Sequence, residues 1–157
     1  MGQLDIDIHW MRQAFVLAKQ SKEQGEVPVG AVLLLNKQFL VSARNQTIAQ
    51  CDPTAHAEIL ALREAARIVN NHRLLEATLY VTLEPCPMCV GAMIQARIKR
   101  LVFAAYDTRL GALGSVYNLL QTKGLNHRFL LSDGLLADEA AEILREFFSQ
   151  RRQKHSV

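Results

Sequence analysis

The sequence predicts an α/β fold: a three-layer α/β/α sandwich around a mixed central sheet of about five strands. The chain has 157 residues, about half of them hydrophobic, which is enough for one ordinary domain with a real core. Short apolar runs alternate with helical patterns of ten or more residues, which is typical of a sheet covered on both faces. Two of these runs are separated by only three polar residues, so a hairpin should form one edge of the sheet.

The opening segment has the pattern of an amphipathic helix followed by this hairpin. Apolar side chains recur at helical spacing between residues 10 and 18, and the helix should end near Gly25. Residues 29–35 and 39–43 are then expected to be strands, because each is a short apolar run. The polar tip between them begins with an asparagine, which tolerates the positive φ of a tight turn.

The second helix is expected to begin at Asp52 and Pro53, as an N-cap followed by proline in the first turn. β-branched residues predict a strand at 78–83. The remaining expected elements are a helix after Pro87, strands at 100–105 and 128–131, and a closing helix from about 137 to 150.

Composition narrows the class of protein. No long apolar run precedes the first helix, so we expect neither a signal peptide nor a membrane span, and we expect a cytoplasmic location.

The three cysteines include one C-x-x-C pair, which argues against a disulfide framework and leaves Cys51 outside the pair. The formal charge of +3 does not by itself indicate a nucleic-acid partner, although cationic side chains gather at 97–100 and 151–154. We expect a single domain over residues 1–157.

Two short motifs, His56-Ala57-Glu58 and Pro85-Cys86-Pro87-Met88-Cys89, supply the parts of a catalytic zinc site. Each lies where a predicted helix begins, so the helix N-termini should converge and lower the pKa of both thiols. Zinc binds imidazole and thiolate readily. A structural zinc is closed by four protein ligands, whereas the three here leave one position for water. Glu58 would then carry protons between that water and the substrate.

Each part of this pattern has a plainer interpretation. A C-x-x-C pair also occurs in structural zinc knuckles and in redox pairs, although a redox pair does not need the histidine and the glutamate. In the absence of a metal, His56 would be a helix cap or a core imidazole, and Glu58 a solvated helix carboxylate.

The two motifs resemble the zinc deaminase signature, H-x-E followed by P-C-x-x-C. The likeness continues through Glu26–Val32, Asp52–Glu58 and Thr78–Cys86, which are similar to the bacterial tRNA-specific adenosine deaminases, and it covers nearly the whole chain. Leu125–Arg128 and the tail around Phe147–Arg152 also resemble that family. The resemblance implies a cytidine deaminase-like fold, one zinc ion per subunit and a homodimer. It further implies binding of a tRNA anticodon stem-loop and conversion of its wobble adenosine to inosine.

The resemblance also implies roles for individual residues. His56, Cys86 and Cys89 would be the zinc ligands and Glu58 the proton shuttle. The implied substrate contacts are Asn45 to the flipped base, a pocket wall of Val27, Pro28 and Val29, Asp107 to a neighbouring ribose 2′-OH, and an RNA path along Phe148, Arg151 and Arg152. The alternative for Asn45 is an ordinary role in a loop. The alternative for Phe148, Arg151 and Arg152 is that they belong to a solvated face of the C-terminal helix.

The segment 108–115 departs from the family pattern. Leu110 and Leu113 are bulkier than the residues usual there, while Arg109 keeps the charge of the usual lysine. How this loop fits RNA or a partner subunit is therefore open.

Two rival functions remain at this stage. A deaminase of free nucleobases or nucleosides, of the cytidine or guanine type, would share the metal chemistry but would not need the basic tail. A non-catalytic, zinc-stabilised RNA-binding subunit should lack the shuttle carboxylate, and Glu58 is present.

Overall fold

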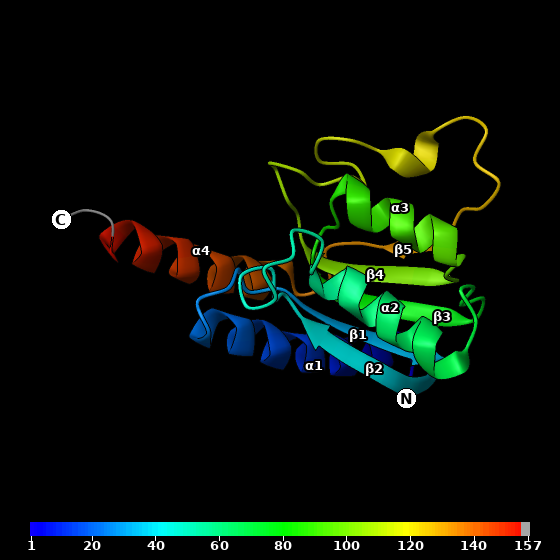
Figure 1. Ribbon diagram of the computed structural model, residues 1–157, viewed down its shortest axis with the longest axis horizontal. Helices are drawn as coiled ribbons and strands as arrows, with labels where there is room; N and C mark the ends of the chain where they lie inside the picture. Colours follow the sequence, from blue (N-terminus) through cyan, green and yellow to red (C-terminus); the bar gives the residue numbers. More distant parts are fainter. Residues whose placement is uncertain (155–157) are drawn as a thin grey trace.

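The computed structural model describes residues 1–154 and has a five-stranded sheet between two layers of helices (Figure 1). The elements in chain order are α1 (Gln3–Glu23), β1 (Gly30–Leu35), β2 (Gln38–Arg44), α2 (Ala57–Val69), β3 (Ala77–Leu83), α3 (Pro87–Ala96), β4 (Arg100–Ala105), the 3₁₀ turn η1 (Leu119–Gln121), β5 (Leu130–Ser132) and α4 (Ala137–Lys154). The strand order is β2-β1-β3-β4-β5. β1 runs antiparallel to β2 and β3, and β3, β4 and β5 are parallel. The predicted sandwich and mixed sheet are confirmed.

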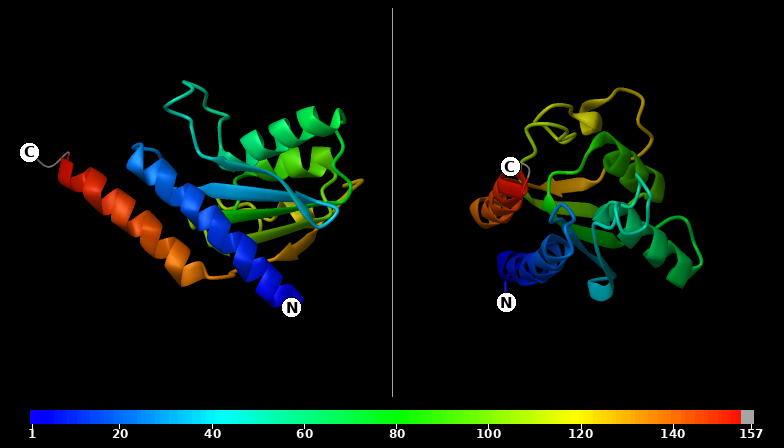
Figure 2. Two further views of the ribbon diagram at one scale, coloured as in Figure 1. Left: turned by 90° about the horizontal axis from the view of Figure 1, so that it is seen from below. Right: turned by 60° about the vertical axis from the view of Figure 1, so that its left-hand side comes forward.

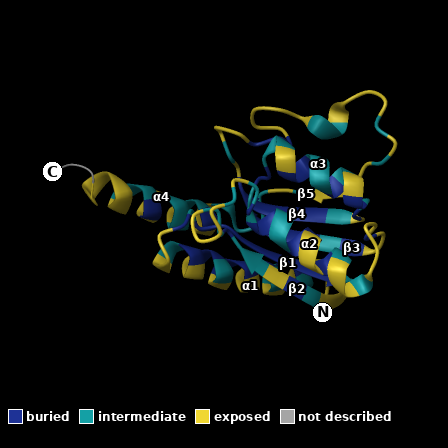
Figure 3. Cartoon of the chain, in the orientation of Figure 1, coloured by how far each residue is buried: buried dark blue, intermediate teal, exposed yellow. Residues whose placement is uncertain are grey.

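Helices cover both faces of the sheet (Figure 2). Each face has its own core, because successive side chains of a strand point to opposite faces. Leu33 and Leu79 pack with α2 and α3, whereas their neighbours Val32 and Tyr80 pack with α1 and α4. The central strands are consequently buried along most of their length (Figure 3). This double burial explains why these strands are continuous apolar runs.

The β1–β2 hairpin has the predicted turn. Asn36 and Lys37 have φ of 52° and 66°, which is the two-residue geometry that matches the twist of paired strands. At the other end of β1, a Cβ on Gly30 would lie 2.0 Å from the carbonyl oxygen of Ala14 in α1. Only glycine lets the helix approach the strand this closely.

The predicted start of the second helix is wrong. α2 begins at Ala57, with His56 as its N-cap. The carboxylate of Asp52 instead accepts hydrogen bonds from the amide (2.8 Å) and hydroxyl (2.7 Å) of Thr54. Asp52 therefore caps a local turn, a competing use of the same side chain, and the chain stays non-helical until His56.

The two longest helices, α1 and α4, are linked by ion pairs on their outer faces. Arg12 pairs with Glu139 at 2.9 Å, and Lys22 pairs with Glu146 at 2.6 Å. Exposed pairs of this kind contribute little to stability, because water screens the charges, so the apolar contacts beneath them fix the packing. Among the described residues, no helix is long and apolar enough to cross a membrane.

A buried polar cluster ties the start of α1 to the sheet. Arg100 donates hydrogen bonds of 2.8 and 2.7 Å to the carboxylate of Asp7, and the hydroxyl of Tyr80 donates another at 2.7 Å. Burial alone would raise the pKa of Asp7. The hydrogen bonds from Arg100, Tyr80 and Gln3, together with the charge of Arg100, outweigh burial and lower that pKa.

The Asp7→Asn variant should lose about 3 kcal/mol of unfolding free energy near neutral pH, because Arg100 loses its buried counter-charge. The folded-state pKa of Asp7 lies below its unfolded value of roughly 3.9. Its stabilising contribution is therefore present above about pH 4 and is lost as pH falls through the folded-state pKa. Urea unfolding from about pH 7 downwards should show the gap between wild type and variant closing. A pH-independent gap, or an equal loss in the exposed control Asp5→Asn, would contradict this.

Candidate active site

Two helix N-termini bring three potential metal ligands together at one end of the sheet. His56 is the N-cap of α2, Cys86 is the N-cap of α3, and Cys89 lies in the first turn of α3. Both caps have extended backbone, with ψ of 150° and 171°. Pro87 occupies the first position of α3, where a missing N–H costs nothing.

The donor atoms have the spacing of a tetrahedral zinc site. Nδ1 of His56 lies 3.7 Å from Sγ of Cys86 and 3.4 Å from Sγ of Cys89, and all three donors lie within 4.8 Å of one another. Bond lengths of about 2.0 Å (Zn–N) and 2.3 Å (Zn–S) at tetrahedral angles place nitrogen and sulfur about 3.5 Å apart. This His/Cys/Cys group therefore fits a zinc ion, as predicted.

The electrostatics of the group differ between its two thiols, although both were expected to have a lowered pKa. The hydrogen bond with Cys86 and burial raise the pKa of Cys89 in the absence of a metal. Hydrogen bonds from the thiol of Cys89 and the ring of His56 lower the pKa of Cys86 to about 4. A thiolate, the form that ligates metal, is thus present at neutral pH. The positive ends of two helices favour the same charge state.

Glu58 lies in the first turn of α2 and is only 4% exposed. Burial raises the pKa of its carboxyl group. A divalent cation bound nearby would act in the opposite direction, so the carboxyl group would be able both to accept and to release a proton. These are the properties of a general acid/base.

A cavity of about 260 Å³ opens beside the His/Cys/Cys group. This volume lies just below the roughly 300–1,000 Å³ of ordinary ligand pockets, so the cavity suits one small ring system. Of the predicted site residues it is lined by Val27, Val29, Asn45, His56, Glu58, Cys86 and Asp107. It is also lined by Ala57 and by four residues that sequence reasoning missed, namely Thr47, Leu83, Glu84 and Leu110.

Asn45 has the loop role considered for it and also lines the cavity. Its side-chain amide donates to the carbonyl of Val27 at 3.2 Å, and its oxygen accepts from the amide of Thr47 at 3.4 Å. It therefore fixes the loop after β2 and also lines the cavity. One N–H and one lone pair of its amide group are left for a ligand.

The other predicted contacts do not lie in the cavity. Pro28 is buried and is not among the lining residues. Phe148, Arg151 and Arg152 lie on the part of α4 that extends past the sheet, at the end where α2 and α3 begin (Figure 1). Arg151 stacks over the ring of Phe147, 5.4 Å from its centroid, and Arg151 and Arg152 are exposed.

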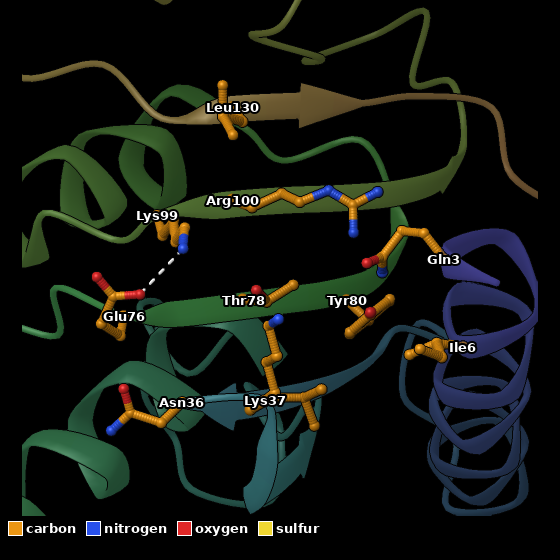
Figure 4. Close-up of a pocket in the computed structure, with 11 residues that line it drawn as sticks. Gln3, Ile6, Asn36, Lys37, Glu76, Thr78, Tyr80, Lys99, Arg100 and Leu130 are labelled. Atoms are coloured by element: carbon orange, nitrogen blue, oxygen red, sulfur yellow. Dashed lines mark hydrogen bonds and ion pairs between the residues drawn. The ribbon is translucent and has the colours of Figure 1, made fainter. Parts of the chain in front are cut away.

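A larger hollow of about 360 Å³ lies at the opposite end of the sheet, where β3 and β4 begin (Figure 4). Two of the three cations that line it are partnered: Lys99 pairs with Glu76 at 3.0 Å, and Arg100 pairs with Asp7. Within residues 1–154, no histidine or cysteine lines it. Size alone does not make this hollow the catalytic site.

Comparison with known proteins identifies the class to which a protein with this fold and this His/Cys/Cys group belongs. A family model described as MafB19-like deaminase matches residues 6–152, so this is a deaminase. A tRNA-specific adenosine deaminase of Haemophilus influenzae is 46% identical over 154 residues, covering 98% of this chain and 89% of the relative. The chain belongs to the family of tRNA-specific adenosine deaminases.

Two solved structures show the same fold. One comes from a study of A-to-I editing by tRNA:A34 deaminases at the wobble position. Its sequence is 42% identical to this chain, and the two structures match with a TM-score of 0.85. The match covers 87% of this chain and 99% of the other chain. The other is a guanine deaminase from Nitrosomonas europaea, 25% identical with a TM-score of 0.74 over 88% of this chain and 82% of its own. The cytidine deaminase-like fold implied by the sequence is thereby confirmed.

Proposed function

We propose that this protein hydrolytically deaminates adenosine to inosine at the wobble position of a tRNA anticodon, using one zinc ion held by His56, Cys86 and Cys89. The observation that carries the proposal is the zinc-like spacing of these three donors beside the buried carboxylate of Glu58. The family to which the chain belongs supplies the substrate class.

The reaction replaces the 6-amino group of adenine with oxygen from water and releases ammonia. When bound, zinc acidifies a water molecule and so provides the nucleophile for C6. Glu58 would carry one proton of the attacking water to the ring nitrogen beside C6, where inosine retains it. It would carry the other water proton to the 6-amino group, which leaves as ammonia when its bond to C6 breaks. The closed surroundings of Glu58 keep these protons from exchanging with bulk solvent.

The cavity would hold the flipped base. Unstacking a base costs a few kcal/mol, least for one that is already in a loop. Val27 and Val29 would contact the ring, and the remaining amide groups of Asn45 would hydrogen-bond its edge. Pro28 would act through the backbone, since its ring fixes φ between the two valines.

Asp107 would meet the nucleotide beside the target base. Its Oδ1 accepts the amides of Arg109 (2.9 Å) and Leu110 (3.2 Å). Oδ2 then remains as an acceptor for a ribose 2′-OH, the group that distinguishes RNA from DNA. Phe148, Arg151 and Arg152 would extend the contact along the RNA by stacking and phosphate binding.

Replacing both Arg151 and Arg152 with alanine should weaken tRNA binding and flatten its salt dependence. Each phosphate contact that is lost reduces the slope of log K against log salt by roughly 0.7 to 0.9. Arg145→Ala is the matched control, because Arg145 lies on the same helix but is paired with Glu142. An unchanged slope in the double variant would mean that the tail is only a solvated helix face.

Incubation of the zinc-loaded protein with unmodified tRNA and, separately, with free adenosine, cytidine and guanine tests the proposal. Inosine confined to the wobble position is expected. The guanine deaminase with the same fold makes free-base deamination the second candidate. Products from free compounds alone would favour that candidate, and no product with zinc bound would favour a non-catalytic RNA-binding subunit.

We further propose that residues 1–157 form one deaminase domain that works as a cytoplasmic homodimer. Support for the dimer comes from the family and from the side chains of α3, where Met88 is 37% exposed. Residues 88–94 are the proposed contact. Sedimentation equilibrium should give twice the mass of one chain, and a charged replacement of Met88 should lower it.

A further inference from the structure

Glu84 is a buried carboxylate that the proposed chemistry does not use. It follows the last residue of β3 and precedes Pro85 and Cys86 in the chain. Only 2% of its surface is exposed, and no cationic side chain in the described part of the chain forms an ion pair with it. A charge this deep in the protein needs hydrogen-bond partners.

The partners of Glu84 all come from one loop, residues 107–115. Oε1 accepts the amide of Asp107 at 3.1 Å and the hydroxyl of Ser115. Oε2 accepts the amides of Leu113 at 3.0 Å and Ser115 at 3.2 Å. Four donors use the acceptor capacity of a carboxylate. Glu84 is therefore occupied by the loop, which leaves it unsuited to act as a general base or a metal ligand.

The loop is built closely around this carboxylate. A Cβ on Gly111 would lie 2.4 Å from the carboxyl carbon of Glu84 and 2.5 Å from the carbonyl oxygen of Asp107. The amide of Ala112 donates to the carbonyl of Pro85 at 2.9 Å, and Leu113 is buried. The bulky Leu113 thus packs inward, while Leu110 is 53% exposed at the cavity.

A second buried carboxylate holds another loop at the cavity in the same way. Glu26 is 1% exposed and accepts the amides of Ile48 at 3.0 Å and Ala49 at 2.9 Å. Its loop carries Thr47, which also lines the cavity. Because each carboxylate holds a different loop, the two provide an internal comparison.

We propose that Glu84 is a positioning residue for RNA: it holds the 107–115 loop so that Asp107 and Leu110 form the part of the cavity mouth that meets the nucleotide beside the target base. Leu110 offers an apolar surface to that base and Asp107 an acceptor to its ribose. This role rests on the proposed RNA substrate. The position of the 107–115 loop would matter little for binding of a free base, because a free base has no neighbouring nucleotide outside the cavity.

The test is Glu84→Gln, which keeps the shape but points an NH₂ group at the loop's own N–H donors. With a wobble-adenosine stem-loop RNA as substrate, KM should rise roughly tenfold, the effect of losing one strong hydrogen bond, whereas kcat should change less than about threefold. Zinc content should stay the same. Hydrogen exchange should become faster at the amides of Asp107, Leu113 and Ser115, since their acceptor is lost.

Two controls make the result specific. Glu76→Gln changes an exposed glutamate at the far end of the sheet and should leave KM and exchange unchanged. Glu26→Gln should speed exchange at residues 48 and 49 and not at 107–115. If Glu84→Gln does not fold, Ser115→Ala is the substitute: it removes only the hydroxyl donor to Glu84 and keeps the amide donor of residue 115. It should raise KM in the same direction but by less.

The outcomes separate this inference from the proposed function. Failure of the wild type to make inosine from any RNA would overturn the proposed function and, with it, the RNA role of Glu84. An active wild type with unchanged KM and exchange in Glu84→Gln would overturn the inference alone. A fall in kcat without a rise in KM would also overturn it, because Glu84 would then act on the reacting groups.

Discussion

Replacing Glu58 with alanine is expected to lower the rate of inosine formation by at least about 10²- to 10⁴-fold, the usual contribution of a positioned acid/base. Glu58 is buried in the first turn of α2, two residues after His56, and it lines the cavity. Zinc content and tRNA affinity should be preserved, because Glu58 is not one of the three grouped ligands. Single-turnover rates, metal analysis and a binding titration measure the three quantities separately.

The matched control for this variant is Glu64→Ala on the same helix. Glu64 is exposed and pairs with Arg67, so its loss should leave turnover unchanged. Near-normal turnover in Glu58→Ala would contradict the assignment of Glu58. A parallel loss of zinc would instead make Glu58 a support of the metal site.

Replacing Cys86 with alanine should abolish activity by a different route, namely loss of the metal. Cys86 is the thiolate of the group, with its pKa lowered to about 4, and two remaining donors are too few for the sites that zinc normally occupies. Zinc per chain should fall from about one to near zero. A chelator applied to the wild type should have the same effect, and added zinc should restore the wild type alone.

Cys51→Ala is the matched control for Cys86→Ala. Cys51 is exposed, on a turn away from the grouped ligands, and its loss should change neither zinc content nor turnover. Full zinc occupancy in Cys86→Ala would overturn the ligand assignment.

The sheet could be predicted from the sequence because its strands have strong local signals. The buried runs of β1, β3 and β4 are apolar throughout, and the turn at Asn36 requires a residue that tolerates positive φ. The start of α2 could not be predicted in the same way. Asp52 is equally suited to capping a helix or a turn, and only its contact with Thr54 distinguishes the two.

In the candidate site, too, some residues could be predicted from local sequence and others depend on contacts between distant segments. His56, Cys86 and Cys89 form a pattern with ligand spacing, and the structure brings their donor atoms together. Glu84 was missed because its partners lie 23 to 31 residues later, in a loop without periodic sequence. An acid at the end of an apolar strand was the one available signal. Pro28 shows the reverse case, since a position inside a motif did not predict a place in the cavity.

The C-terminal end of α4 has a consequence for how this protein can change. Phe147 is the last buried residue of the helix, and the arginines that follow are exposed. Surface substitutions of this kind usually alter unfolding free energy by no more than about 0.5 kcal/mol. Charge can therefore be added or removed there almost without effect on folding. Affinity for a polyanion is in this way adjustable over evolution independently of the fold that holds the catalytic centre.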